Sequence, residues 1–357
     1  MTLYGHLGGA APGGPFFDDL FGGQVFDAAP SMTLTPGVAA SHQQIVGDRL
    51  RLALDSDLAH AVTGVSGALA HPALVCDIAI GQSTLATQRV TANLFYRGLV
   101  FHRYPVIGDT LFTRTQVVGL KQNSDRPGRA RSGLAALRMT TIDHTGALVL
   151  DFYRCAMLPL SPGAGDTGHA DDLSGIGSDA AVPADASQMG AERPTAADPT
   201  SHWDAGAFRA RVPGPHFHPD LAGSVLRSSA DVVSGAPELA RLTLNIAAVH
   251  HDRRAAGGRR LVYGGHSIGL ALAQATRLLP NIATVLGWRS CDHLGPVYEG
   301  DTLYSELEVV TARALPGDRG GVLSLRSQVF AVGEDHPADA DDERRPVLDW
   351  EFSALHF

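Results

Sequence analysis

PVIGDTLFTRTQVVGLK, at residues 105–121, has a counterpart in PVYEGDTLYSELEVVTAR, at residues 296–313. The two stretches share Pro-Val, Gly-Asp-Thr-Leu and Val-Val in the same order. In both, apolar and polar residues alternate after the Gly-Asp pair, which is typical of a half-buried strand that follows a turn. An internal match at a spacing of about 190 residues predicts a duplicated domain.

Two further pairs of segments extend this repeat in both directions. GALVLDFYRCAML, from Gly146, shares Val-Leu-Asp and an apolar tail with RPVLDWEFSALHF, from Arg345. LFGGQVFDAAPSMTLT, from Leu20, is matched more weakly by LAGSVLRSSADVVS, from Leu221. The repeat therefore covers most of the chain outside the N-terminus and a central segment.

Each half has the same expected order of elements: a short strand, a polar loop, an apolar helix and three or four alternating strands. In the second half, apolar residues at helical spacing predict a helix over about 265–279, which Pro280 ends. A long helix followed by an antiparallel sheet predicts an α+β fold in which the sheet wraps around the helix. Two such copies can join edge to edge into one continuous sheet, which covers two exposed edges. In the second half, strands are expected at about 282–290, 302–314, 320–332 and 346–355.

Composition indicates the domain boundaries. Residues 161–202 are rich in Gly, Ala, Ser, Asp and Pro and have almost no large apolar side chains. Such a segment cannot bury enough surface to offset the entropy that ordering costs. The sequence therefore predicts a disordered tail over 1–15, a first domain over 16–160, a flexible linker over 161–202 and a second domain over 203–357.

Charge and cysteine usage argue against several classes of function. A formal net charge of −9 disfavours general affinity for nucleic acid or anionic membranes, which bind basic surfaces. The three cysteines are far apart, so neither a disulfide framework nor a metal cluster is expected. Neither a secretory signal nor a stretch of roughly 20 apolar residues is found. We expect a soluble, cytoplasmic protein that is a monomer or a homodimer.

Several motifs together point to a family. They are the loop from Asn245 to His250, the Tyr263-Gly264-Gly265-His266 stretch ahead of the expected helix, and the two Gly-Asp-Thr-Leu strands. With these motifs the chain resembles the MaoC-like branch of the hot-dog superfamily, in its double hot-dog form. That branch contains (R)-specific enoyl-CoA hydratases and 3-hydroxyacyl-CoA dehydratases.

A narrower resemblance rests on FFDDLFGGQVF, VVGLKQN, NIAAVH, GRRLVYGGH and VLDWEFSAL. In these stretches the chain is similar to mesaconyl-CoA hydratases, also called β-methylmalyl-CoA dehydratases. The resemblance implies a tandem hot-dog fold and an acyl-CoA substrate. It implies no cofactor beyond the CoA that the substrate carries.

The family signature places an aspartate five residues before a histidine, and neither half of this chain has both residues. The second half has Asn245 and His250 at these positions, whereas the first half has Asp48 and Ala53. Asn with His resembles the pattern of the mesaconyl-CoA hydratases. The resemblance therefore implies a catalytic second half and a degenerate first half, in which Asp48 is structural.

Hydration of a 2-enoyl thioester needs a base for water, a proton for C2 and donors for the charge that develops on the thioester oxygen. His250 is the candidate base because imidazole titrates near neutral pH. Asn245 can orient the water or the imidazole through its amide. His266 or Asp252 could share the proton transfers. The alternative for His250 is a loop histidine that is only hydrogen-bonded.

The start of the expected helix offers a site for the thioester oxygen. Gly264 and Gly265 allow close approach to the backbone, and free N–H groups at a helix start suit an oxyanion hole. His266 is a candidate for the same contact, with a structural role in the first turn as the alternative. Tyr263 is a candidate substrate contact.

Two arginines and several histidines are further candidates for ligand binding. Arg259 and Arg260 precede the helix and could meet CoA phosphates or a second carboxylate, or form a solvated pair. HFHPD at 216–220 and the pair at 250–251 lack the spacing of a zinc site, so no metal is expected.

Three functions remain open from the residues. Reversible addition of water to a 2-enoyl-CoA, with mesaconyl-CoA as the substrate the resemblance favours, is the main hypothesis. A non-catalytic acyl-thioester-binding protein is the second, because a decayed site would also leave an incomplete dyad. A thioesterase would need a carboxylate near a helix start, where the first half has Asp77 and the second has His266.

Overall fold

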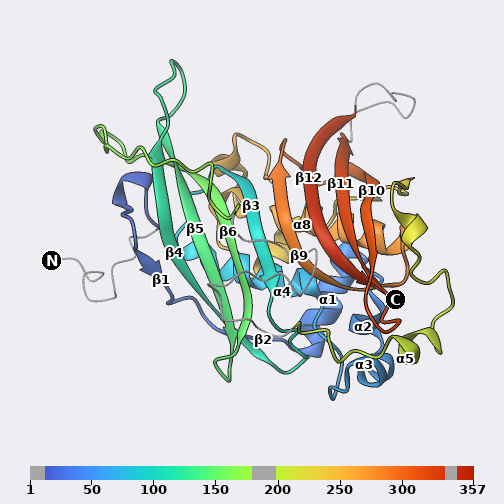
Figure 1. The fold of residues 1–357 in the computed structure, drawn as a ribbon. Helices are drawn as coiled ribbons and strands as arrows, with labels where there is room; N and C mark the ends of the chain where they lie inside the picture. The colour runs from blue at the N-terminus through green and yellow to red at the C-terminus, as the bar shows by residue number, and fades with distance from the viewer. Residues whose placement is uncertain (1–12, 179–197, 334–343) are drawn as a thin grey trace.

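The computed structural model describes residues 13–178, 198–333 and 344–357. Figure 1 shows them as one broad sheet with helices gathered on one face. Within these residues the sheet has 12 strands in the order β1-β4-β5-β6-β3-β9-β12-β11-β10-β7, with β2 paired to β4 and β8 to β10. All of these pairs are antiparallel. The predicted α+β class is therefore confirmed.

The two halves supply the strands in the same order along the chain. The first half has β1 (Val25–Phe26), β2 (Met32–Thr33), β3 (Ala92–Phe101), β4 (Thr110–Gln122), β5 (Ser132–Asp143) and β6 (Leu148–Pro159). The second half has β7 (Val225–Arg227), β8 (Asp231–Val232), β9 (Ile282–His293), β10 (Thr302–Ala314), β11 (Gly321–Val332) and β12 (Arg345–His356). The four strands expected in the second half correspond to β9, β10, β11 and β12.

One long helix per half is buried against the sheet. These are α4 (Pro72–Gln82) and α8 (Gly264–Leu278). Proline suits the first position of α4 because no intrahelical acceptor exists there for the N–H it lacks. The other α-helices are α1 (Pro36–Val46), α2 (Arg51–Leu54), α3 (Ser56–Thr63), α5 (Ala205–Arg209), α6 (Ala236–Leu242) and α7 (Ala248–His251).

The halves meet where β3 pairs with β9, at the centre of the sheet in Figure 1. The pairing runs from Phe95 opposite Asp292 to Val100 opposite Gly287. It removes the free edge that each half would otherwise present. Arg97 bonds to Asp292 across this junction at 2.6 Å. The sheet is therefore continuous through both copies.

Part of the segment between the halves packs on the sheet. Leu173 is buried with Ala136 and Cys155 in a small separate cluster, and the N–H of Asp171 donates to the carbonyl oxygen of Leu120 at 3.1 Å. Within the described part of the expected linker, Leu173 is therefore packed on the sheet, whereas most of the other residues in 161–178 are exposed. Residues 179–197 of the linker, and residues 1–12 of the expected tail, lie outside the described residues.

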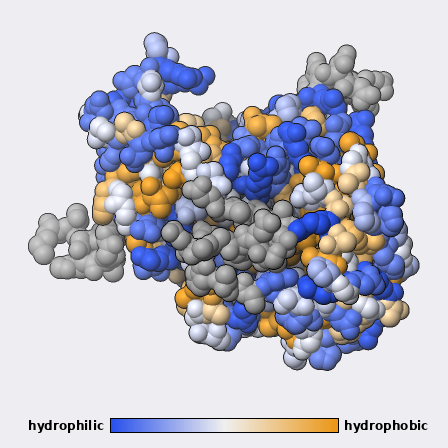
Figure 2. Space-filling model, in the orientation of Figure 1, coloured by the Kyte–Doolittle hydropathy of each residue, from blue (hydrophilic) through white to orange (hydrophobic). Residues whose placement is uncertain are grey.

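The face in Figure 2 mixes hydrophilic and hydrophobic residues. Large apolar side chains that are exposed, such as Phe21 and Val225, come from separate elements of the fold. In the described ranges, none of the helices has the length and apolar character needed to cross a bilayer.

Candidate active site

A cavity of about 510 Å³ opens where the two halves meet. The first half supplies Thr84, Arg154, Tyr96 and residues 90–94, which lie at and just before the start of β3. The second half supplies α7 and its preceding loop, the start of α8 and residues 293–298 after β9. The size falls in the range of small-molecule sites. Both copies of the repeat thus build one site.

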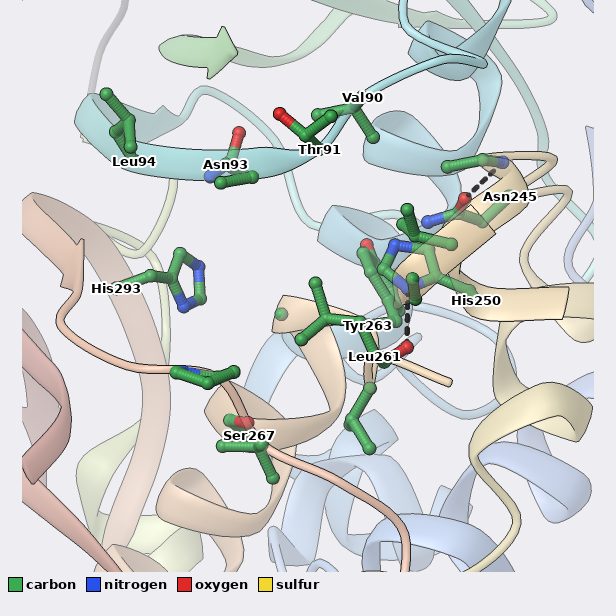
Figure 3. A pocket seen from close by; sticks show the side chains of 18 of the residues that line it. Val90, Thr91, Asn93, Leu94, Asn245, His250, Leu261, Tyr263, Ser267 and His293 are labelled. Atoms are coloured by element: carbon green, nitrogen blue, oxygen red, sulfur yellow. Dashed lines mark hydrogen bonds between the residues drawn. The ribbon is translucent and has the colours of Figure 1, made fainter. Parts of the chain in front are cut away.

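His250 lies in α7 with its Nδ1 at 2.8 Å from the carbonyl oxygen of Leu261. Leu261 also donates its N–H to the carbonyl oxygen of Val249 at 3.1 Å, so it holds α7 at two points. Because a carbonyl oxygen only accepts, Nδ1 carries the proton and Nε2 is an acceptor. Figure 3 shows the imidazole beside the open space, with residues of the β3 segment across from it.

The ring of His250 is kept neutral by its surroundings. Burial lowers the pKa of His250 to about 4, the bond to Leu261 opposes this, and the charges of His251 and Arg154 lower the pKa further. The ring also packs against that of Tyr263, with 5.7 Å between centroids. At neutral pH the imidazole is therefore in the form that accepts a proton.

Asn245 is 2 % exposed and lies beside His250 in Figure 3. Its Oδ1 accepts the N–H of Ala247 at 3.0 Å. Only the amide oxygen can accept, so this bond fixes the orientation of the amide and leaves the nitrogen as a donor elsewhere. The structure therefore brings together the two residues that the sequence singled out as the reacting pair.

A left-handed turn delivers Asn245 to the site. Leu244, directly before it, has φ 61°, and Gly47, directly before Asp48, has φ 67°. The same turn thus precedes the corresponding residue in each half. For leucine this conformation costs about 1–2 kcal/mol, which the surrounding contacts must offset.

The end of α4 supports the loop that carries Asn245. A Cβ on Gly81 would lie 1.7 Å from the carbonyl oxygen of Thr243, so only glycine allows this approach. Thr84 accepts the N–H of Ile246 at 3.1 Å. The first half therefore positions the loop of the second half.

Gly264 begins α8 and lines the cavity, as Tyr263 and Ser267 also do. The first N–H groups of a helix have no intrahelical acceptor, so the N–H of Gly264 is available to a ligand. A Cβ here would lie 2.6 Å from the ring of His293. Glycine thus permits the close packing of the helix start against this wall.

Gly265 and His266 lie on the other side of the helix start, outside the cavity lining. A Cβ on Gly265 would lie 2.0 Å from Oδ1 of Asp77, which itself pairs with His42 at 3.1 Å. His266 is 0 % exposed, and neither ring nitrogen has a hydrogen-bond partner among the described residues. Burial, and then the charge of His42, lower the pKa of His266 to about 4.

Arg259, Arg260 and Asp252 also lie away from the cavity lining. The guanidinium of Arg259 stacks 4.1 Å above the ring of Tyr298, and that of Arg260 is 3.8 Å from Glu299. Both arginines are exposed. Asp252 is bound by the neighbouring Arg254.

Asn93, His293 and Arg154 are among the polar residues of the cavity that were not found from the sequence. Both amide atoms of Asn93 and the Nε2 of His293 are buried without a partner in the described part of the chain. Burial lowers the pKa of His293 to about 4. The third residue is Arg154, which lies in β6 of the first half. No group of three His, Cys, Asp or Glu suited to a metal occurs among the described residues.

In the first half, aromatic side chains fill the place that corresponds to Gly295, whereas a separate cavity of about 660 Å³ is lined by Asp48 and Arg51. Tyr104 precedes Pro105, whereas in the second half Gly295, which lines the cavity, precedes Pro296. The Tyr104 hydroxyl donates to the carbonyl oxygen of Val285 at 3.0 Å. Its ring packs against that of Trp203, 5.1 Å away. Two aromatic side chains thus occupy what is open space around His250.

Asp48 has structural bonds in the first half. Its Oδ1 accepts the N–H of Leu50 at 2.5 Å and lies 3.1 Å from Nε2 of His71. Ala53 stands where the second half has His250, so the half-site lacks a proton acceptor at that position.

No family model matches the chain. Among curated proteins it is similar to a β-methylmalyl-CoA dehydratase of Chloroflexus aurantiacus, 28% identical over 360 residues, which cover 96% of this chain and 97% of the relative. It is also similar to a mesaconyl-CoA hydratase of Cereibacter sphaeroides, 27% identical over 322 residues and 88% of each protein.

Two solved structures match over almost the whole chain. A conserved protein of Mycobacterium tuberculosis with a double hot-dog fold is 66% identical, has a TM-score of 0.89 and is matched over 97% of this chain and 100% of that one. A protein of Chloroflexus aurantiacus described as a MaoC domain dehydratase is 25% identical, with a TM-score of 0.78 and coverage of 96% and 97%. This chain therefore belongs to the MaoC-like dehydratase family, in its double hot-dog form.

Proposed function

We propose that the chain is a hydro-lyase that adds water reversibly to a 2-enoyl-CoA thioester, with mesaconyl-CoA or β-methylmalyl-CoA as substrate. The names of the two curated relatives support this substrate class. The observation that carries the proposal is the fixed tautomer of His250, whose Nε2 is an acceptor in a cavity of suitable size.

In hydration, Nε2 of His250 accepts a proton from water while the water oxygen bonds to C3 of the substrate. The electrons of the C2–C3 double bond move toward the thioester, and the N–H of Gly264 donates to the oxygen that becomes negative. His250 then gives its proton to C2, so the ring returns to its starting state. The amide nitrogen of Asn245 donates to the water oxygen and orients it. Dehydration follows the reverse path.

The asparagine at position 245 favours one competing function, an acyl-thioester-binding protein without turnover. A thioesterase has less support, because Asp77 is bound to His42 and lies outside the cavity. The cavity residues among the described ranges include neither Asp nor Glu. Water activation there rests on the imidazole of His250.

Loss of the conjugated thioester absorbance tests the proposal. The purified chain is mixed with mesaconyl-CoA, crotonyl-CoA and a longer enoyl-CoA, and His250→Ala is expected to lower kcat by about 10²- to 10⁴-fold. The matched control is Asp48→Asn, which places an asparagine at the position in the first half that corresponds to Asn245. This variant should leave kcat unchanged. Equal losses in both variants would contradict the division of roles between the halves.

Two other outcomes would replace the hydro-lyase proposal. Unchanged absorbance with every substrate, while CoA esters still raise the melting temperature, would indicate the binding protein. Release of free CoA would indicate a thioesterase.

A further inference from the structure

Arg154 is a buried arginine in the wall of the cavity. It is 4 % exposed and lies in β6 opposite Tyr96 of β3. Its guanidinium donates to the hydroxyl of Thr87, and its Nε has no hydrogen-bond partner in the described part of the chain. Arg154 and His250 line the same cavity, and the positive charge of Arg154 is the smallest of the causes that lower the pKa of His250.

The charge of Arg154 has no counterion among the described residues. Neither Asp nor Glu lines the cavity there. The phenols of Tyr96 and Tyr263 cannot supply one, because burial raises the pKa of both and keeps them neutral. Arg138, on the neighbouring strand, shows the usual arrangement, with two bonds to the carboxylate of Asp151. A buried cation without such a partner is strongly unfavourable.

The internal repeat shows that the fold does not need a charge at this position. Val-Leu-Asp occurs at 149–151 and at 347–349, and the third residue after each is Arg154 and Phe352. Phe352 is 2 % exposed and stacks on Trp350, with 3.8 Å between centroids. The same place in the other copy is therefore apolar. The arginine is present only in the first copy, where β6 borders the open cavity.

We propose that Arg154 binds a carboxylate on the acyl chain of the substrate, so that the site selects thioesters of dicarboxylic acids. The proposal deepens the hydro-lyase function and depends on it for the reaction, though not for binding. The planar guanidinium matches a carboxylate through two parallel bonds. The ligand supplies the missing negative charge.

The position of Arg154 in the same cavity as His250 fits this chemistry. In a 2-enoyl thioester of a four-carbon dicarboxylic acid, the free carboxylate is bonded to C3, the carbon that receives water. Its receptor must therefore lie next to the base. Arg259 and Arg260 are exposed and are not part of the cavity lining, whereas Arg154 is buried in it.

Two substrates that differ only in the carboxylate test the proposal. Mesaconyl-C1-CoA has this group, whereas 2-methylcrotonyl-CoA has a methyl group in its place. Arg154→Met is expected to lower kcat/KM for mesaconyl-C1-CoA by about 100-fold or more, and to leave that for 2-methylcrotonyl-CoA unchanged or higher. Arg154→Lys keeps the charge but not the two parallel N–H donors, so it should give an intermediate loss of kcat/KM for mesaconyl-C1-CoA.

Equal losses with both substrates would overturn the proposal and indicate a structural role or a role at the thioester oxygen. An unchanged kcat/KM for mesaconyl-C1-CoA would overturn it as well. Arg154→Met should also raise the melting temperature, because it removes an unpaired buried charge. If that variant fails to fold, two measurements still test the proposal. They are the activity of the Arg154→Lys variant and the preference of the unaltered protein between the two substrates.

Binding separates failure of this proposal from failure of the hydro-lyase function. Methylsuccinyl-CoA and 2-methylbutyryl-CoA are saturated, cannot be hydrated and differ in the same carboxylate. In calorimetric titration the unaltered protein should bind the first at least 10-fold more tightly, and Arg154→Met should abolish the difference. This holds even if no enoyl-CoA is turned over. Equal affinities in the unaltered protein would overturn the proposal that Arg154 binds a carboxylate and would leave the hydro-lyase proposal untouched.

Discussion

His250 and Asn245 owe their orientations to backbone groups rather than to one another. The carbonyl of Leu261 fixes the tautomer of the imidazole, and the N–H of Ala247 fixes the amide. Each side chain thus has one nitrogen left, an acceptor on His250 and a donor on Asn245. An acceptor and a donor together can hold one water molecule in a defined orientation. An aspartate at position 245 would replace the donor with a second acceptor.

The pKa of His250 predicts the pH dependence of the reaction. Because the pKa is about 4 and only the neutral ring accepts a proton, kcat/KM should be constant from about pH 6 to 8 and fall toward acid with a midpoint near 4. A series of initial rates in overlapping buffers measures this. A midpoint at the ordinary histidine value of about 6.5 would show that the ring is hydrated in the free protein.

The neighbouring His251 gives a control for this profile. Its charge is one of the causes that lower the pKa of His250. His251→Gln keeps a donor for the carbonyl oxygen of Asn245, which lies 2.6 Å from the imidazole Nε2. We expect the acid midpoint of this variant to move upward.

At the scale of secondary structure elements, the two central helices differ in their first turn. The third residue of α4 is Leu74, and the third residue of α8 is His266. Both are buried. Leucine suits this place, whereas the imidazole of His266 has no hydrogen-bond partner in the described ranges, which is costly for a buried polar group.

His266→Leu, which copies the first half, should therefore stabilise the protein by about 1–3 kcal/mol and retain turnover. Urea unfolding followed by circular dichroism measures the stability. Because His266 lies outside the cavity lining, a large loss of kcat in this variant would show that the ring takes part in the reaction after all.

The same variant should weaken the loss of stability in acid. The pKa of His266 is about 4 when folded and about 6.5 when unfolded. Between these values the unfolded chain binds a proton that the folded chain does not, so stability falls as the pH falls from 6.5 to 4. His266→Leu removes up to about 1.4 kcal/mol per pH unit of this dependence.

The elements could largely be predicted from sequence because their signals are local. The alternation of apolar and polar residues after the second Gly-Asp turn predicted β10. The helical spacing of apolar residues, ended by Pro280, predicted α8 to within one residue at each end. The cavity was harder, because it depends on the pairing of β3 with β9, which no local pattern specifies. Arg154 could have been found from the internal repeat. In the alignment of the two Val-Leu-Asp segments, the charged Arg154 corresponds to the apolar Phe352.

At the scale of the whole molecule, the space around His250 is open, whereas its counterpart beside Tyr104 is filled. Tyr104 and Trp203 fill the place that corresponds to the cavity around His250. Sequence composition could not predict this, because Trp203 follows directly on the polar segment that was expected to be a linker. Its burial depends on contacts with residues about 100 positions away along the chain.

The filled counterpart of the cavity predicts the stoichiometry and separates stability from activity. Calorimetric titration with a saturated CoA ester should give one binding site per chain. Trp203→Ala should lower the free energy of unfolding by about 3–5 kcal/mol, because it leaves a cavity in the core, while kcat stays the same. Two binding sites per chain, or a variant that loses turnover while still folded, would show that the first half also takes part.

The cavity takes His250 from one repeat and Arg154 from the other. In a homodimer of single hot-dog subunits, symmetry would copy every substitution into both sites. A tyrosine that closed one site would close both. Once the two genes were fused, selection could act on each copy separately, and one copy could give up its own site to become a wall of the other. The one remaining site thus depends on residues of both halves, so neither half could function as a separate subunit without losing it.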